Sequence, residues 1–253
     1  MRGIVRTLVG AGLALAVVAA LAGVLAGLGT KLGFWDFRTG FAVLRWSVYG
    51  ALAAVALSGA GLLGAMHQRS ARLGLTALPG LVIALAAAAV PLLHVRMVEA
   101  YPPIHDITTD TKNPPRFVAL AEIREEAPNA VAYPGETTAK QQKQAYPNIR
   151  PLTVPVSPER AFDAARAAAA AMGWNIAAAD AEARRIEATA ETFWFGFRDD
   201  VAVRVTARED GGSRIDVRSA SRVGVSDLGA NAKRIREFLA GVQERLPGAA
   251  PAE

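Results

Sequence analysis

The stretch VAVRVTAREDGGSRIDVRS, residues 201–219, decides the fold of the C-terminal half of the chain. Valine alternates with other residues over 201–206, and the uncharged Ile215, Val217 and Ser219 alternate with the charged Asp216 and Arg218, the period of two that is typical of β-strands. Asp210-Gly211-Gly212 lies between the two runs and is a strong signal for a hairpin turn. The stretch therefore predicts two antiparallel strands.

Two more strands and two helices are predicted around this hairpin, because the flanking segments show the same alternation or a helical spacing of apolar residues. The strands span 174–179 and 185–192, and the helices span 158–172 and a segment that begins near Ser226 or Asp227. The prediction is an α+β domain over 158–253, in the order helix, four-stranded antiparallel sheet, helix.

The first 97 residues contain three apolar runs, 7–29, 46–66 and 73–95. About 20 apolar residues in a helix cross a hydrocarbon core of ~30 Å, so each run is long enough for a transmembrane helix. The first run is also long for the apolar part of a cleaved signal peptide, and two more runs follow it closely. Residues 1–97 are therefore predicted to form a three-helix transmembrane region.

Charge is distributed unevenly along the chain. Residues 1–97 carry eight basic side chains and one acidic one, whereas the rest of the chain carries 20 basic and 22 acidic groups. The excess of positive charge thus belongs to the flanks of the apolar runs, which argues against nucleic acid as a partner. We expect a multi-pass protein of the bacterial inner (cytoplasmic) membrane with a periplasmic C-terminal domain, although the flanking charges are nearly balanced between the two sides.

Residues 98–157 form a proline-rich connector, predicted to pack on the domain with short helices at 117–126 and 137–145. The connector contains the one His–Asp cluster of the sequence, His105, Asp106 and Asp110. These side chains are candidate metal ligands or an acid–base group. The alternative is a network of turns in which the side chains bond the backbone of the loop.

Three segments resemble one known family. They are FWFGFRDDV (193–201), RSASRVGVSDLGAN (218–231) and PIHDITTD (103–110). The chain is similar over about residues 100–245 to the bacterial and plastid family catalogued as domain of unknown function fourteen-ninety-nine. The resemblance implies a membrane-tethered envelope domain and implies no reaction.

The polar face of the predicted sheet is the first candidate for binding. Arginines of one parity share this face, and the guanidinium fork suits carboxylate and phosphate. The residues are Arg204, Arg208, Arg214, Arg218 and Arg222. The alternative is that carboxylates on neighbouring strands neutralise these arginines.

The junction after the last strand is the second candidate, and an aromatic run is the third. The junction gathers Arg218, Ser221, Arg222, Asp227 and Asn231. Its alternative interpretation is that Asp227 caps the helix and the arginines brace the corner. The aromatic run consists of Phe193, Trp194 and Phe195, with Phe197 two residues on. Consecutive aromatic side chains cannot all point into the core, so some face a groove, a partner or the bilayer interface, or stack under the connector.

The sequence has no Gly-x-Ser-x-Gly elbow, no Walker loop and no cysteine, which disfavours a nucleophilic enzyme. We expect a non-catalytic, membrane-anchored envelope protein without a cofactor, whose C-terminal domain binds an anionic lipid head group, an anionic polymer or a protein partner. One alternative is a metal-assisted hydrolase that uses His105, Asp106 and Asp110. The other is a structural subunit that docks on another membrane protein.

Overall fold

The computed structural model describes residues 2–246 and 250–251. Contacts divide the chain into two compact units, residues 1–97 with 193–196 and residues 98–192 with 197–253.

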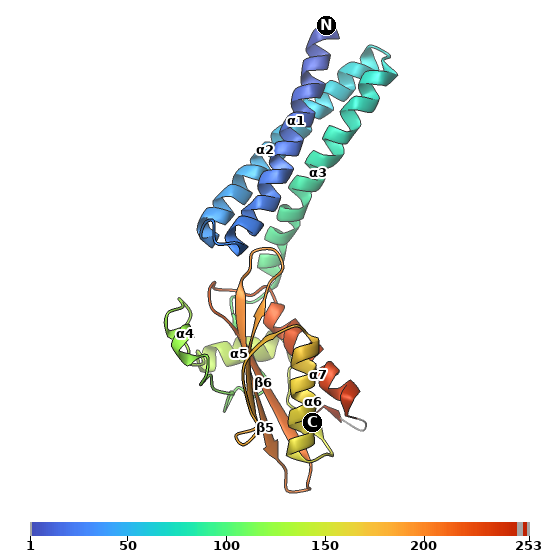
Figure 1. Ribbon diagram of the computed structural model, residues 1–253. Coiled ribbons are helices and arrows are strands. Elements are labelled where there is room, and N and C mark those ends of the chain that lie inside the picture. Colours follow the sequence, from blue (N-terminus) through green and yellow to red (C-terminus); the bar gives the residue numbers. More distant parts are fainter. Residues whose placement is uncertain (1, 247–249, 252–253) are drawn as a thin grey trace. The chain divides into compact units, whose positions relative to one another are not determined.

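The first unit consists mainly of three long helices, α1 (Arg2–Lys31), α2 (Phe37–His67) and α3 (Ala71–Ala100) (Figure 1). All three are long and apolar enough to cross a membrane, which agrees with the three predicted runs. Glycine lets α1 and α2 approach closely, because a Cβ on Gly12 would lie 2.5 Å from Ser58 Oγ. Asp36 begins α2 ahead of the apolar run, since its carboxylate accepts hydrogen bonds from the N–H groups of Arg38 and Thr39.

The second unit is built on one antiparallel sheet. Its main strands are β3 (Asn175–Asp180), β4 (Arg185–Glu191), β5 (Arg198–Ala207) and β6 (Ser213–Ser221). The predicted hairpin is confirmed: β5 pairs with β6, and Val203 lies opposite Val217.

The prediction of four strands is wrong, because the described residues form a seven-stranded sheet. The additional strands are β1 (Asp106–Thr108), β2 (Leu152–Val154) and β7 (Ala250–Pro251). The order is β3-β4-β5-β6-β2-β7, and β1 also pairs with β6. These strands have only two or three residues, too few for an alternating pattern, and two of them lie in the proline-rich connector.

Two helices cover the apolar face of the sheet, α6 (Pro158–Ala171) and α7 (Ala230–Arg245). The core between these helices and the sheet contains valines of β5 and β6. In it the ring of Trp174 stacks on Phe238 with 5.1 Å between centroids. The last helix begins later than predicted, because Leu228 and Gly229 adopt positive φ. Asp227 nevertheless accepts hydrogen bonds from the N–H groups of Gly229 and Asn231.

The connector covers the opposite face of the sheet and makes a third layer (Figure 1). It contains α4 (Ala121–Glu125) and α5 (Glu136–Ala145). Phe117 and Leu120 of the connector pack against Ala202 and Ala220 of the sheet. Both faces of the sheet are therefore covered, one by α6 and α7 and the other by residues 109–145.

Candidate functional site

A layer of ion pairs lies between the sheet and the connector. At its centre, Arg218 of β6 forms two hydrogen bonds with Asp106 of β1, Nε to Oδ1 at 3.0 Å and Nη2 to Oδ2 at 2.7 Å. Both side chains are buried. The ring of Phe117 contacts two guanidinium groups, with its centroid 4.7 Å from Arg218 and 4.7 Å from Arg124.

A second buried carboxylate, Asp200 of β5, joins two arginines from different parts of the chain. Arg124 of α4 approaches it to 2.8 Å and Arg222 also to 2.8 Å, while the Thr189 hydroxyl donates at 2.7 Å. Burial alone raises the pKa of Asp200, but the hydrogen bonds from these donors outweigh it and hold the pKa below its ordinary value. Asp200 is therefore ionised at neutral pH.

A third group of pairs lies further along the same face. Asp216 Oδ2 is 3.1 Å from Arg204 Nη2 and 3.0 Å from Arg214 Nε, and Asp110 also contacts both arginines. Asp110 Oδ1 accepts hydrogen bonds from the N–H groups of Lys112 and Asn113. This carboxylate thus ties the connector loop to the sheet.

Glu187 of β4 binds the backbone of the connector just before α4. Its carboxylate is fully buried and accepts hydrogen bonds from the N–H groups of Val118, Ala119 and Leu120 at 2.9 to 3.1 Å. Arg185 Nε lies 3.1 Å from it. The loop that covers the sheet is therefore fastened through its own backbone, which the sequence pattern did not indicate.

The His105, Asp106 and Asp110 cluster is not gathered into one ligand set. Asp106 is paired with Arg218, and Asp110 forms the turn and the arginine contacts described above. No group of three His, Cys, Asp or Glu side chains in the described part of the chain is placed to hold a metal ion. The placement agrees with the alternative interpretation, a network that bonds the loop to the domain.

The five residues of the predicted junction are separated by the sheet. Arg218 and Arg222 lie on the connector side, whereas Ser221 and Asn231 meet on the helix side, where Asn231 Nδ2 donates to Ser221 Oγ at 3.0 Å. Asn231 is fully buried, and its Oδ1 accepts from Ser219 Oγ at 2.7 Å.

Arg234 of α7, which we did not predict, completes the helix-side network through an ion pair with Asp199 at 2.6 Å. Burial, the largest influence, raises the pKa of Asp227, which caps this end of α7. A binding role for the arginines and polar groups of the junction stays a prediction, and the observed contacts connect elements of the fold.

The aromatic run 193–196 belongs to the helical unit. Trp194 Nε1 donates to the carbonyl of Val24 at 3.1 Å, and the Phe195 ring lies 5.0 Å from Phe41, between centroids. Phe193 is 87% exposed. Trp194 and Phe195 thus pack against α1 and α2, while Phe193 projects outward.

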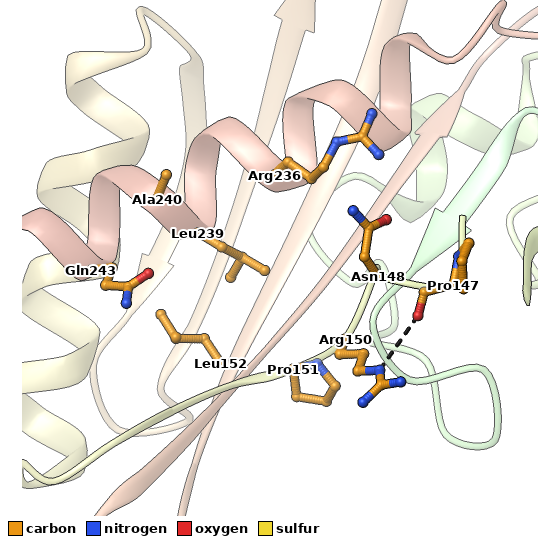
Figure 2. Close-up of a pocket in the computed structure, with 9 residues that line it drawn as sticks. All are labelled: Pro147, Asn148, Arg150, Pro151, Leu152, Arg236, Leu239, Ala240 and Gln243. Carbon is orange, nitrogen blue, oxygen red and sulfur yellow. Dashed lines mark hydrogen bonds between the residues drawn. The ribbon is translucent and has the colours of Figure 1, made fainter. Parts of the chain in front are cut away.

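A groove that sequence reasoning missed lies between α7 and residues 147–152 (Figure 2). Its volume is about 530 Å³, within the ~300–1,000 Å³ of typical ligand sites. Leu239 faces Leu152 across an apolar centre, and Arg150 and Arg236 lie toward one end (Figure 2). Its two walls are far apart in the sequence, so no local motif marks the groove. The only sequence signal for it was the helical spacing of apolar residues in α7.

The comparison with protein families supports the resemblance seen in the sequence. The family model described as "Protein of unknown function (DUF1499)" matches residues 106–242, more than half of the chain. The chain belongs to this family. No curated protein matches the chain closely enough to be compared with it.

The DUF1499 match begins at the first residue of β1 and ends inside α7. It therefore spans the ion-pair layer and most of the groove, and it leaves out α1, α2 and α3. In this DUF1499 protein, the matched segment is the three-layer domain, and the apolar helices are an addition at its N-terminal side.

Proposed function

We propose that the protein is a membrane-anchored, non-catalytic binding protein whose C-terminal domain holds an anionic amphiphile, a lipid-like molecule with a phosphate or carboxylate head group. The observation that carries this proposal is the groove of Figure 2, which joins an apolar centre to two arginines. Neither Arg150 nor Arg236 has a carboxylate partner within the described residues. By contrast, Arg204, Arg214, Arg218 and Arg222 on the sheet face are all paired.

The shape of the groove supports an elongated ligand. The guanidinium groups and Asn148 lie toward one end, where they can donate hydrogen bonds to a head group, and the apolar centre can accept an alkyl chain (Figure 2). Burial of each methylene contributes about 0.8 kcal/mol, so a short chain adds substantially to the charge contacts. The groove binds and orients its ligand through these contacts alone.

The proposed location is the bacterial inner membrane. The support is that α1, α2 and α3 are each long and apolar enough to span it. Three spans place the two ends of the chain on opposite sides of a bilayer, so a cytoplasmic N-terminus gives a periplasmic C-terminal domain. A reporter fusion at each end of the full chain tests this orientation.

Titration of the full chain with octyl phosphate tests the binding proposal. The protein is reconstituted in zwitterionic lipid nanodiscs, and empty nanodiscs provide the blank. We expect saturable binding that is at least about tenfold weaker in Arg150→Gln/Arg236→Gln, because tenfold corresponds to about 1.4 kcal/mol and two charge-assisted hydrogen bonds exceed that. Lys233→Gln, an exposed change on the same helix, is the matched control.

Two control ligands test separately the charge of the head group and the contribution of the alkyl chain. Octyltrimethylammonium has a similar chain and the opposite charge, so it should not bind. Inorganic phosphate lacks the chain, so it should bind much more weakly than octyl phosphate. Equal affinity of octyl phosphate for the wild type and the double arginine variant would contradict the proposal.

A further inference from the structure

A second cavity of the C-terminal unit lies beside α5 and has a different character. Its volume is about 910 Å³, and Lys112, Lys140 and Lys143 line it together with Tyr133 and Glu136. Three lysines and one carboxylate line the cavity, so its wall carries a net positive charge. All these residues belong to the segment that covers the charged face of the sheet.

The lysines of this cavity are not neutralised by the fold. None of the three has a carboxylate partner among the residues whose positions are described. Lys140 and Lys143 are three residues apart on α5, which makes them neighbours on the helix surface. Like charges at this spacing repel one another, and a bound anion removes that repulsion.

Tyr133 gives the cavity an aromatic wall. Its ring centroid lies 5.7 Å from the Arg218 guanidinium, which fixes the ring against the buried ion-pair layer. Burial raises the pKa of its hydroxyl, which therefore stays protonated. Pro114 lies in the same wall, and Thr111 and Gln144 add a hydroxyl and an amide.

We propose that this cavity binds an anionic saccharide, a sugar chain that carries carboxylate or phosphate groups. The lysine ammonium groups are point charges and accept either anion without a fixed geometry. The faces of Tyr133 and Pro114 suit the C–H face of a pyranose ring, and Thr111 and Gln144 suit its hydroxyls. The cavity is far larger than a single phosphate, and it lacks the pair of facing leucines that suits the groove of Figure 2 to an alkyl chain.

The test is calorimetric titration of the full chain in nanodiscs with four probes: trigalacturonate, glucose 1,6-bisphosphate, maltotriose and inorganic pyrophosphate. We expect at least one of the two anionic sugars to bind, and the better one identifies carboxylate or phosphate as the anion. Maltotriose, which is neutral, should not bind detectably. Binding of maltotriose as tight as that of trigalacturonate, or of pyrophosphate as tight as that of both sugars, would overturn the proposal.

Variants locate the binding in this cavity. Lys140→Gln/Lys143→Gln should weaken binding of the anionic sugar at least tenfold, whereas Lys233→Gln on α7 should leave it unchanged. Both lysines of the double variant are exposed, so its folding should be unaffected, which hydrogen exchange of the β5 and β6 amides verifies. Unchanged affinity in the folded double variant refutes the site. Because octyl phosphate is predicted to bind elsewhere, its binding should persist in this variant.

Discussion

The face of the sheet under α6 and α7 is covered by alanine, valine, isoleucine and aromatic side chains, whereas the face under the connector is covered by arginines paired with carboxylates. The apolar face is held by many contacts that each contribute little, so the loss of one methylene group costs only about 0.5–1.5 kcal/mol. A buried ion pair is different, since the removal of one partner leaves the other charge without compensation. The arginines of the sheet face therefore connect the layers of the domain, whereas Arg150 and Arg236 of the groove and the lysines of the second cavity are left for ligands.

The largest loss of stability is expected when one member of the Asp106–Arg218 pair is removed. Asp106→Ala should lower the free energy of unfolding by about 3–5 kcal/mol, because Arg218 stays buried without its carboxylate. Native-state hydrogen exchange of the β6 amides in the full chain measures this loss. The control is Asp106→Leu/Arg218→Met, which should recover most of the stability because neither charge remains.

Glu187→Gln should cause the next largest loss in the free energy of unfolding. The amide keeps the shape of the side chain but removes the charge that accepts the N–H groups of Val118, Ala119 and Leu120. We expect a loss of about 1–3 kcal/mol. Faster hydrogen exchange should be concentrated at residues 118–120, and equal exchange there in both proteins would contradict the prediction.

Acid should weaken the charged face before the apolar one. The pKa of Asp200 is lowered in the folded protein, so its contribution to stability is present above the ordinary carboxyl pKa and is lost as the pH falls through the lower, folded value. Asp227 has the opposite sign, because its raised pKa gives a penalty at neutral pH that is relieved on acidification.

Hydrogen exchange of the β5 amides is measured between pH 6 and pH 3 and corrected for the intrinsic effect of pH on exchange. It reports the sum of the stability lost at Asp200 and the stability gained at Asp227 on acidification. Asp200→Asn should reduce the acid-induced loss of stability, and Asp227→Asn should increase it. Identical pH profiles of the wild type and both variants would show that these carboxylates do not govern the response.

Ile186→Val on the apolar face should cost only about 0.5–1.5 kcal/mol, because it removes one buried methylene group. The cost should also be the same at pH 4 and pH 7, since Ile186 belongs to the apolar core cluster and the change removes no titratable group. Urea unfolding of the full chain in detergent at the two pH values checks both statements. A strong pH dependence would mean that the two faces are coupled.

The parts of this fold that could be predicted are those with a repeated pattern. Alternation over 201–219 predicts the central hairpin, and the three uncharged runs predict α1, α2 and α3. β1 and β2 could not be found this way because three residues do not establish a period. The groove was missed because its walls, residues 147–152 and α7, meet only in the folded chain.

The partners of the arginines could not be predicted either, because they are distant in the sequence. The parity of Arg218 predicts its face, but not that its partner is Asp106, 112 positions away in the sequence. Arg124 and Arg234 gave no signal, since each belongs to a helix whose other charged residues are exposed. Ala202 and Ala220 were the available clue, because small apolar residues on a charged face indicate that another layer packs there.

Octyl phosphate binding by two arginine variants of the full chain distinguishes the groove from the sheet face. Arg150→Gln/Arg236→Gln changes the groove, and Arg222→Gln changes the sheet face, where the guanidinium is paired with Asp200. We predict that the groove variant loses at least about tenfold in affinity and that the folded Arg222 variant binds like the wild type. Loss of binding in Arg222→Gln, with the groove variant unaffected, would contradict binding in the groove and place the ligand on the sheet face.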